Sequence, residues 1–206
     1  MQVNIHAALT QEPLLTASAK QTLFWEGDDC NHVYQVSSGI VRGVTLSESG
    51  ERQIIAFFFA GDQIGLPITS AYRYSAEAIT EVSYIRQTHD QWRMELVESC
   101  QRDGGMLRSI GAEQNPIYRR GMILGRQGAV ARVAAFLYSI MDRLPCDRDG
   151  FKLPMPQLDI ADYLALSPET VCRSLKRLRQ MAIIDMPAHD QLVVHDRSAL
   201  ELAAHK

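Results

Sequence analysis

Long apolar runs are missing from this 206-residue sequence. A membrane-spanning helix needs about twenty predominantly apolar residues in a row, and no such stretch occurs. The first ten residues have no basic segment followed by an apolar core, so the sequence predicts no secretory signal. We therefore expect a cytoplasmic protein with no membrane partner.

Clustered cysteines are also missing. The four cysteines lie far apart, at positions 30, 100, 146 and 172, and no CxxC pair or Cys/His cluster occurs. A zinc site needs closely grouped ligands, so none is expected. In a cytoplasmic protein these cysteines should be free thiols. The sequence therefore predicts neither a metal nor a cofactor.

An excess of positive charge is the third absence, because the formal net charge is −3. The distribution of charge is more informative than its sum. Basic side chains crowd one short segment at Arg173, Lys176, Arg177 and Arg179, while acidic residues gather in 26–62. A local basic patch is the usual mark of a nucleic-acid-binding surface. A nucleic acid therefore stays among the candidate partners.

The first half of the chain consists of short β-type runs separated by glycine-containing turns. The length suits one large or two small domains, and 46% hydrophobic with 22% charged residues is ordinary for a globular protein. Residues 1–19 are weakly patterned and are expected to begin with a short helix. The predicted strands are residues 22–25, 32–36, 40–46, 53–59, 75–79 and 82–86. Such spacing indicates a β-sandwich or barrel.

Residues 153–179 predict two helices joined by a short turn. Their sequence is LPMPQLDIADYLALSPETVCRSLKRLR. Ser167 is a typical N-cap, Pro168 suits the first helical position, and Glu169 places a carboxylate in the first turn. Two helices linked by about three or four residues form a helix-turn-helix.

The second of these helices has two different faces. Apolar residues at 171, 175 and 178 form one stripe, whereas Glu169, Cys172, Arg173 and Lys176 lie on another. An arginine can bind guanine through two hydrogen bonds, and a glutamate can accept one from cytosine. The alternative is an ordinary amphipathic helix with its charged face in water, and the pattern alone leaves both open.

The flanking segments complete a small domain. Residues 128–144 predict an amphipathic helix and 145–150 a loop. Residues 183–184 and 191–194 predict a two-stranded wing, and 198–204 a final helix.

The segment DIADYLALSPETVCRSLKRLRQMAII resembles the DNA-binding segment of the CRP/FNR family of bacterial transcription regulators. The match centres on Glu169-Thr170-Val171-x-Arg173. Earlier in the chain, the motifs EGD, VYQVSSG, GER and AGDQIG resemble the β-roll of cyclic-nucleotide-binding domains, which precedes the helix-turn-helix in this family. Together the two matches cover residues 20–90 and 125–195. The resemblance implies an α+β protein with a β-roll (1–98), a dimerisation helix (99–126) and a winged helix-turn-helix domain (127–206).

The nucleotide pocket departs from the family pattern. Members that bind cyclic nucleotides have Glu-Leu after a Gly-x-x-x-Gly motif, and this chain has Gly65-Leu66-Pro67 there. They also have Arg-Ser/Thr-Ala, whose arginine pairs the cyclic phosphate; this chain has Tyr74-Ser75-Ala76. Arg73 lies one position early, and a one-residue slip in a strand points a side chain to the other face. We therefore expect a degenerate pocket that does not bind cAMP.

The N-terminal cysteines of the oxygen-sensing members are absent as well. Residues 1–29 contain no cysteine, and an iron–sulfur cluster needs several thiolates. The chain therefore resembles the FixK branch, whose members match the same type of DNA site without the cluster.

Residues 95–126 are expected to be helical. Met106, Ile110, Ile117 and Leu124 form a narrow apolar seam suited to a two-stranded coiled coil, and in the family this helix forms the dimer. Pro116 should kink or break the helix. A broken helix packed on its own sensor domain is the alternative.

The resemblance implies a homodimer that binds double-stranded DNA, reads a palindrome of the TTGAT-N4-ATCAA type, activates transcription and contacts RNA polymerase. The residues that it assigns to DNA are Ser167, Pro168, Glu169, Thr170, Cys172, Arg173, Lys176 and Arg177. A haem- or gas-sensing member is a second hypothesis, with His6, His32, His89 or Cys30 as possible iron ligands. An enzyme is not expected, because no nucleophile–base motif occurs.

Three positions in the DNA-binding segment depart from the family. Pro156 replaces the usual threonine N-cap, Ala165 replaces the usual turn glycine, and Cys172 stands where the FNR branch has serine. Cations and a helix N-terminus beside Cys172 favour its thiolate, which peroxide oxidises. We therefore expect redox regulation of DNA binding through Cys172. The alternative is that a small residue is simply needed there for close approach to DNA.

Overall fold

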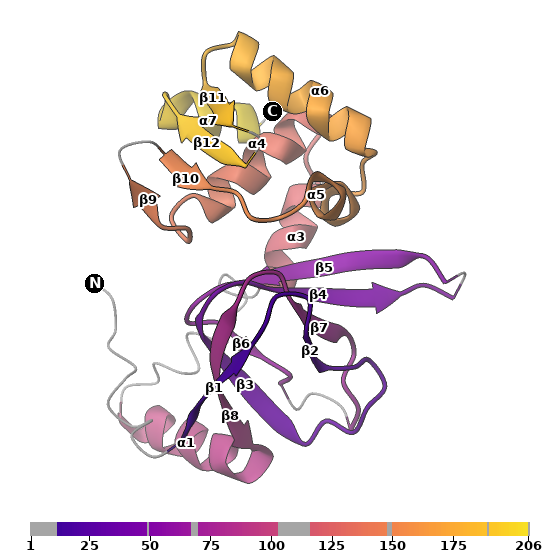
Figure 1. Ribbon diagram of the computed structural model, residues 1–206, viewed down its shortest axis with the longest axis vertical. Coiled ribbons are helices and arrows are strands. Elements are labelled where there is room, and N and C mark those ends of the chain that lie inside the picture. Colours follow the sequence, from indigo (N-terminus) through magenta and orange to yellow (C-terminus); the bar gives the residue numbers. More distant parts are fainter. Residues whose placement is uncertain are drawn as a thin grey trace. The chain divides into compact units, whose positions relative to one another are not determined.

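The computed structural model describes residues 12–48, 50–66, 70–102, 116–147, 150–188 and 190–205. The chain divides into two compact units, residues 1–119 and 120–206. The first is rich in strands and the second contains the helix-turn-helix, so the expected α+β class is confirmed (Figure 1). Within the described part of the chain, no helix has the length and apolar character needed to cross a membrane.

Two antiparallel four-stranded sheets build the first unit (Figure 1). One sheet has the strand order β1 (Leu14–Ala17), β8 (Val82–Thr88), β3 (His32–Ser38) and β6 (Gln63–Ile64). The other has the order β2 (Thr22–Phe24), β7 (Ser75–Ala78), β4 (Val41–Leu46) and β5 (Arg52–Phe58). All six predicted strands are present, with bounds shifted by one or two residues.

Side chains from both sheets meet in one core. Val36 and Ile64 come from the first sheet, and Phe24, Phe58 and Ala76 come from the second. Inward and outward residues alternate along β7, which is the pattern of a strand with one buried face. The two sheets therefore pack face to face, as the turn pattern of the sequence predicts.

The beginning of residues 1–19, where a short helix is expected, lies outside the described chain; β1 follows it, with Leu14 paired to Ile85 of β8. The next helix differs from the sequence-based expectation. α1 (His89–Arg102) begins earlier than residue 95. Its start is a capping box, because Thr88 and Gln91 exchange backbone-to-side-chain hydrogen bonds of 2.7 and 3.3 Å.

The predicted dimerisation helix, residues 99–126, is described only at its two ends, in α1 and α3. Residues 103–115, and with them Met106 and Ile110, lie outside the described chain. α3 runs over Pro116–Leu124, so Pro116 occupies the first helical position, where a missing N–H costs no hydrogen bond. Ile123 is buried, whereas Ile117, Tyr118 and Met122 are about half exposed, at 45%, 51% and 52%.

The second unit places four helices beside a small sheet. The helices after α3 are α4 (Ala129–Ile140), α5 (Gln157–Leu164), α6 (Pro168–Gln180) and α7 (Arg197–Ala204). The predicted stripe of α4 is buried, for example at Val133, Leu137 and Ile140. An exposed ion pair between Asp142 and Arg197 links the segment after α4 to the start of α7.

The wing is larger than the two strands that the sequence predicts. β11 (Ile184–Ala188) and β12 (Gln191–Val194) are joined by β10 (Gly150–Lys152) and β9 (Cys146–Asp147) in the order β11-β12-β10-β9. The predicted loop at 145–150 is therefore wrong. Gly150 explains why the strand fits, since a Cβ there would lie 2.3 Å from the carbonyl oxygen of Leu192. The sequence showed this glycine only as a turn residue.

Candidate nucleic-acid interface

α6 forms because its first turn is capped and one of its faces is apolar. The hydroxyl of Ser167 accepts a hydrogen bond from the N–H of Thr170, and Pro168 takes the first helical position. Val171, Leu175 and Leu178 are buried, as the sequence predicts. This burial fixes which side of α6 faces the solvent.

The turn between α5 and α6 is held by a left-handed residue. Ala165 has φ +52°, and its N–H bonds back to α5. The N–H of Leu166 donates to the carbonyl of Ala161 at 3.0 Å. At the other end, Pro156 precedes α5 without any side-chain cap. Both departures from the family pattern are therefore accommodated in a regular helix-turn-helix.

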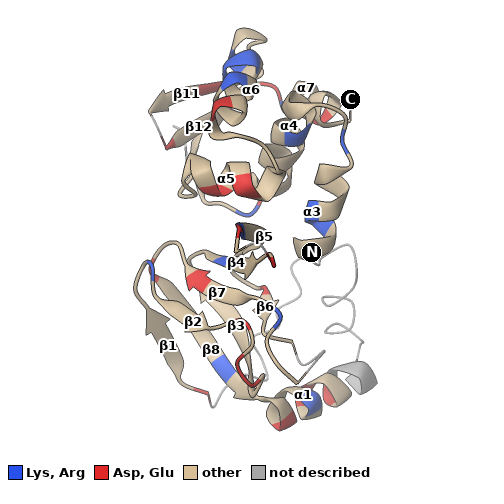
Figure 2. Cartoon of the chain, turned by 90° about the vertical axis from the view of Figure 1, so that its right-hand side faces the viewer, with Lys and Arg blue, Asp and Glu red and all other residues tan. Residues whose placement is uncertain are grey.

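The solvent-facing side of α6 carries the predicted reading residues. Glu169, Cys172, Arg173 and Lys176 are all exposed, and Figure 2 shows basic residues gathered along α6. The N–H of Glu169 itself, then the Ser167 hydroxyl and Arg173, lower the pKa of the Glu169 carboxyl. Glu169 is thus held as an anion. Its carboxylate can accept hydrogen bonds, and the nearby guanidinium of Arg173 can donate them.

Arg173 is oriented by a neighbour on the same helix. One of its terminal nitrogens donates to the hydroxyl of Thr170 at 3.3 Å. That hydroxyl also lies 3.0 Å from the hydroxyl of Ser167. Ser167, Thr170 and Arg173 therefore form one hydrogen-bonded row at the start of α6.

The two flanks of α6 differ. On the wing side, Cys172 lines a groove of about 430 Å³ with Lys176, Arg179 and Met186. On the opposite side, Arg177 lines a second groove with residues of α4 and α7, among them Leu202. The structure thus places Cys172 and Lys176 along the groove on the wing side of α6. Arg177 lies on the far flank.

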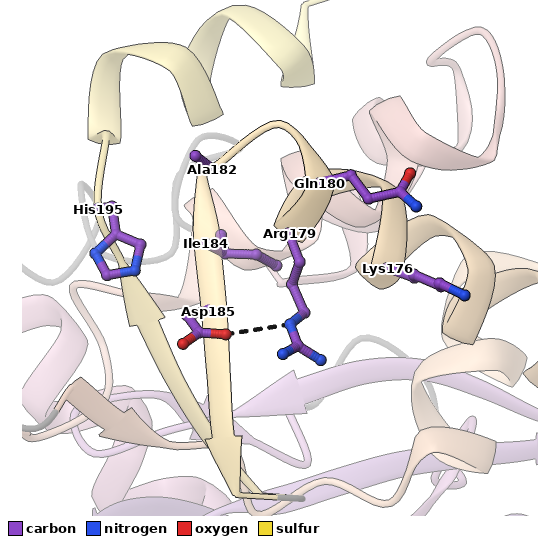
Figure 3. Close-up of a pocket in the computed structure, with 7 residues that line it drawn as sticks. All are labelled: Lys176, Arg179, Gln180, Ala182, Ile184, Asp185 and His195. Carbon is purple, nitrogen blue, oxygen red and sulfur yellow. Dashed lines mark hydrogen bonds and ion pairs between the residues drawn. The ribbon is translucent and has the colours of Figure 1, made fainter.

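Arg179 is engaged with the wing. Its Nε lies 3.1 Å from Oδ1 of Asp185, which also accepts the N–H of Met186. Figure 3 shows this ion pair in a pocket of about 470 Å³ that is also lined by Lys176, Gln180, Ala182, Ile184 and His195. Sequence reasoning grouped Arg179 with the other basic residues. It had no signal for the carboxylate that holds it.

An aromatic side chain stands where cyclic-nucleotide-binding members have their arginine. The ring of Tyr74 stacks on Phe58, with 5.7 Å between ring centroids, and lies 5.5 Å from the ring of Phe24. Its hydroxyl accepts the N–H of Gly65 at 3.2 Å, and burial raises its pKa. Arg73 is exposed. No guanidinium is therefore supplied by positions 73 and 74 to the interior of the β-roll.

Two of the candidate iron ligands, Cys30 and His89, lie next to each other. Cys30 is buried in the core, where its thiol donates to the carbonyl of Gly65 at 3.6 Å and lies 3.6 Å from Nε2 of His89. Burial raises the pKa of Cys30, which keeps it a thiol. Among described residues, no group of three or more His, Cys, Asp or Glu could hold a metal ion. His6 lies outside the described chain.

Comparison with known proteins accounts for both units. Residues 14–98 match the cyclic nucleotide-binding domain, and residues 131–203 match the Crp-like helix-turn-helix domain. The nitrogen fixation regulation protein FixK of Rhizobium meliloti is 36% identical over 181 residues, covering 84% of this chain and 79% of that protein. The chain belongs to the CRP/FNR family of transcription regulators.

Other CRP/FNR proteins extend the comparison. The fumarate and nitrate reduction regulatory protein of Escherichia coli K12 is 28% identical over 193 residues, covering 90% of this chain and 76% of that protein. The structure of FixK2 from Bradyrhizobium japonicum has a TM-score of 0.82 and 30% identity, covering 93% and 96% of the two chains. This CRP/FNR protein is thus a FixK-like, DNA-binding transcription regulator and not an enzyme.

Proposed function

We propose that this regulator binds DNA as a homodimer and reads a palindrome of the TTGAT-N4-ATCAA type with α6. The observation that carries the proposal is the exposed row of Glu169, Arg173 and Lys176 on a capped helix. In the major groove, Arg173 donates to guanine and Glu169 accepts from cytosine. Ser167, Pro168, Thr170 and Cys172 surround these contacts at the start of the helix, and Lys176 and Arg177 bind phosphates.

A palindrome requires two recognition helices about 34–36 Å apart, which is one turn of DNA. One chain has one α6, so a second copy must supply the other. The exposed apolar side chains of α3 support this assembly, because Ile117, Tyr118 and Met122 are each about half exposed in a single chain. We propose that α3 and the preceding residues, with Met106, Ile110, Ile117 and Leu124, pair across the dimer axis. The functional division would then be 1–98, 99–126 and 127–206.

We further propose that oxidation of Cys172 regulates binding. The thiol is exposed on α6, one residue before Arg173, and lines a groove with Lys176 and Arg179. Exposed thiols beside cations are the ones that peroxide converts to sulfenic and then sulfinic acid. A sulfinate would place negative charge where phosphates approach. Repulsion would then weaken binding while the fold is unchanged.

The test is fluorescence anisotropy with a TTGAT-N4-ATCAA duplex and a scrambled duplex of equal length, measured over a range of salt concentrations. We expect specific binding at least about 10³-fold tighter than nonspecific binding, with a steep salt dependence. Light scattering on the same samples should give two chains per duplex. Equal affinity for both duplexes, or tight specific binding by a monomer, would refute the proposal.

Activation and contact with RNA polymerase are tested separately by in vitro transcription. A promoter carrying the palindrome upstream of the polymerase site should give more transcript with the regulator than without it. A scrambled palindrome is the matched control. A decrease in transcript from the intact promoter would show a repressor.

A further inference from the structure

The C-terminal end of α5 is closed by side chains from other helices. A helix leaves its last carbonyl groups without internal partners. Here the carbonyls of Ala161 and Asp162 accept N–H groups of the turn. The carbonyl of Tyr163 instead accepts Nε of Arg120, from α3, at 2.8 Å. α3 is therefore bonded to the last residues before the helix-turn-helix turn.

Arg120 holds this position through a second contact. Its guanidinium lies over the ring of Tyr163, 5.8 Å from the centroid, and that ring packs on Phe136 of α4 at 5.5 Å. Nη2 of Arg120 is buried without a hydrogen-bond partner among the described residues, and desolvation lowers the pKa of the group. A buried guanidinium nitrogen left unpaired is costly. An arginine that served only solubility would not be expected at a position with this cost.

The chain segment that links α3 to the helix-turn-helix fixes the direction of α3 less firmly than the contacts of Arg120 do. Residues 125–128 read Gly-Arg-Gln-Gly. Gly128 has φ +85°, a conformation that glycine adopts without strain, and α4 begins there without a side-chain cap. Arg132 of α4 donates to the carbonyl of Arg126 at 3.2 Å and so ties the link to α4. The direction of α3 is then set by Arg120 across the link.

We propose that Arg120 is a positioning residue that selects the spacing between the two half-sites. This inference rests on the proposed homodimer. If α3 lies at the dimer axis, the angle between α3 and the helix-turn-helix fixes the separation of the two α6 helices. A shift of about 3.4 Å in that separation corresponds to one base pair. Arg120 touches no DNA in this scheme, and it acts through the Tyr163 carbonyl.

The experiment measures the affinity of the full chain for palindromes with spacers from two to six base pairs and for a single half-site. The variants are Arg120→Ala, Arg120→Lys and, as the matched control, Arg119→Gln on the same helix. We expect Arg120→Ala to keep the half-site affinity within about twofold, but to lose about tenfold on the best spacer. Its discrimination between neighbouring spacers should fall as well. Arg120→Lys should be intermediate, and Arg119→Gln should match the wild type.

Two results would overturn the inference. One is a wild-type spacer profile in Arg120→Ala. The other is an equal loss on half-site and palindrome by both Arg120 variants, which would mark a purely structural role. Failure of the proposed function is distinguishable, because the wild type itself would then show no spacer optimum or no dimer.

Discussion

The hydroxyl of Ser167 accepts the N–H of Thr170 at 3.2 Å, and the Thr170 hydroxyl in turn accepts a hydrogen bond from Arg173. The group that caps α6 is therefore linked through one side chain to the group that is proposed to read guanine. Helix stability and DNA readout share these residues, and variants at Ser167 and Arg173 should separate the two effects.

Replacing Ser167 with alanine removes the cap. We expect the free energy of unfolding of the second unit to fall by about 1 kcal/mol. Ser167→Asp should retain most of the stability that the cap contributes, because aspartate is an equally good N-cap. Urea denaturation followed by circular dichroism measures the change. Equal stability of wild type and Ser167→Ala would show that the cap contributes nothing.

Arg173→Ala should cost about 1–3 kcal/mol of binding free energy and relax specificity at one base pair in each half-site. Arg177→Ala is the control. As a proposed phosphate contact on the flank of α6, Arg177 should contribute to binding of all sequences alike, so its loss should weaken all of them and reduce the salt dependence. Competition among single-base variants of the palindrome distinguishes the two patterns. Wild-type discrimination in Arg173→Ala would mean that α6 is placed differently on DNA.

Peroxide should abolish DNA binding by wild type, and Cys172→Ala or Cys172→Ser should resist it. The cause is the negative charge of the oxidised sulfur beside the phosphates. A gel-shift titration with peroxide measures this. Single replacements of Cys30, Cys100 and Cys146 are the controls and should not protect. Equal loss of binding in wild type and Cys172→Ala would end the redox hypothesis.

Cyclic AMP should leave the melting temperature unchanged at millimolar concentration. A ligand that binds the native state raises stability in proportion to the logarithm of its excess over the dissociation constant. Tyr74 packs on Phe58 and Gly65 at the position of the phosphate-binding arginine, so the anion has no bidentate partner there. Differential scanning fluorimetry tests this, and a rise in melting temperature would contradict it.

The first unit should lose stability on mild acidification. Desolvation, then Arg86 and His89, lower the pKa of His32; desolvation and Arg93 lower that of His89, against a smaller opposing effect of Asp90. The two histidines therefore bind protons less readily in the folded state than in the unfolded chain, where the pKa of a histidine is about 6.5. The stability that the two neutral histidines contribute is present above that pH. It is lost as the pH falls through their lower pKa values in the folded state.

Melting temperatures between pH 7.5 and 5 measure this loss. His89→Gln should flatten the pH dependence. His205→Gln, at the exposed end of α7, should leave it as in wild type. An unchanged slope in His89→Gln would show that other groups cause the effect.

The strands and the helix-turn-helix were predictable because each depends on local signals. The alternating β runs and the Ser-Pro-Glu start of α6 specify their structures within a few residues. β9 and β10 could not be predicted in this way, because they form only against a strand that is distant in the sequence. Phe151 pairs with Leu192 of β12, and the absence of a Cβ at Gly150 lets the two strands approach. The start of α1 was missed although its capping box, Thr88-x-x-Gln91, is visible in the sequence.

The chemistry of the interface was predictable on α6 but not around it. The helical period puts Glu169, Arg173 and Lys176 on one face and therefore predicts their exposure. It cannot predict that Asp185 binds Arg179 or that Arg120 reaches Tyr163, because those partners come from other elements. The exposed apolar side chains of Tyr118 and Met122 were also missed, since a strict seven-residue seam selects only Ile117 and Leu124.

Ala165 adopts a left-handed conformation that costs an L-residue with a Cβ roughly 1–2 kcal/mol relative to the right-handed one. Stability can therefore be gained at this turn, two residues before the Ser167 cap of α6. Replacing Ala165 with glycine would release the strain and raise the stability of the DNA-binding unit. The added stability would offset a destabilising substitution elsewhere, for instance one that alters which bases α6 is proposed to recognise. Variants with new DNA specificities should be easier to select in a protein that already carries Ala165→Gly.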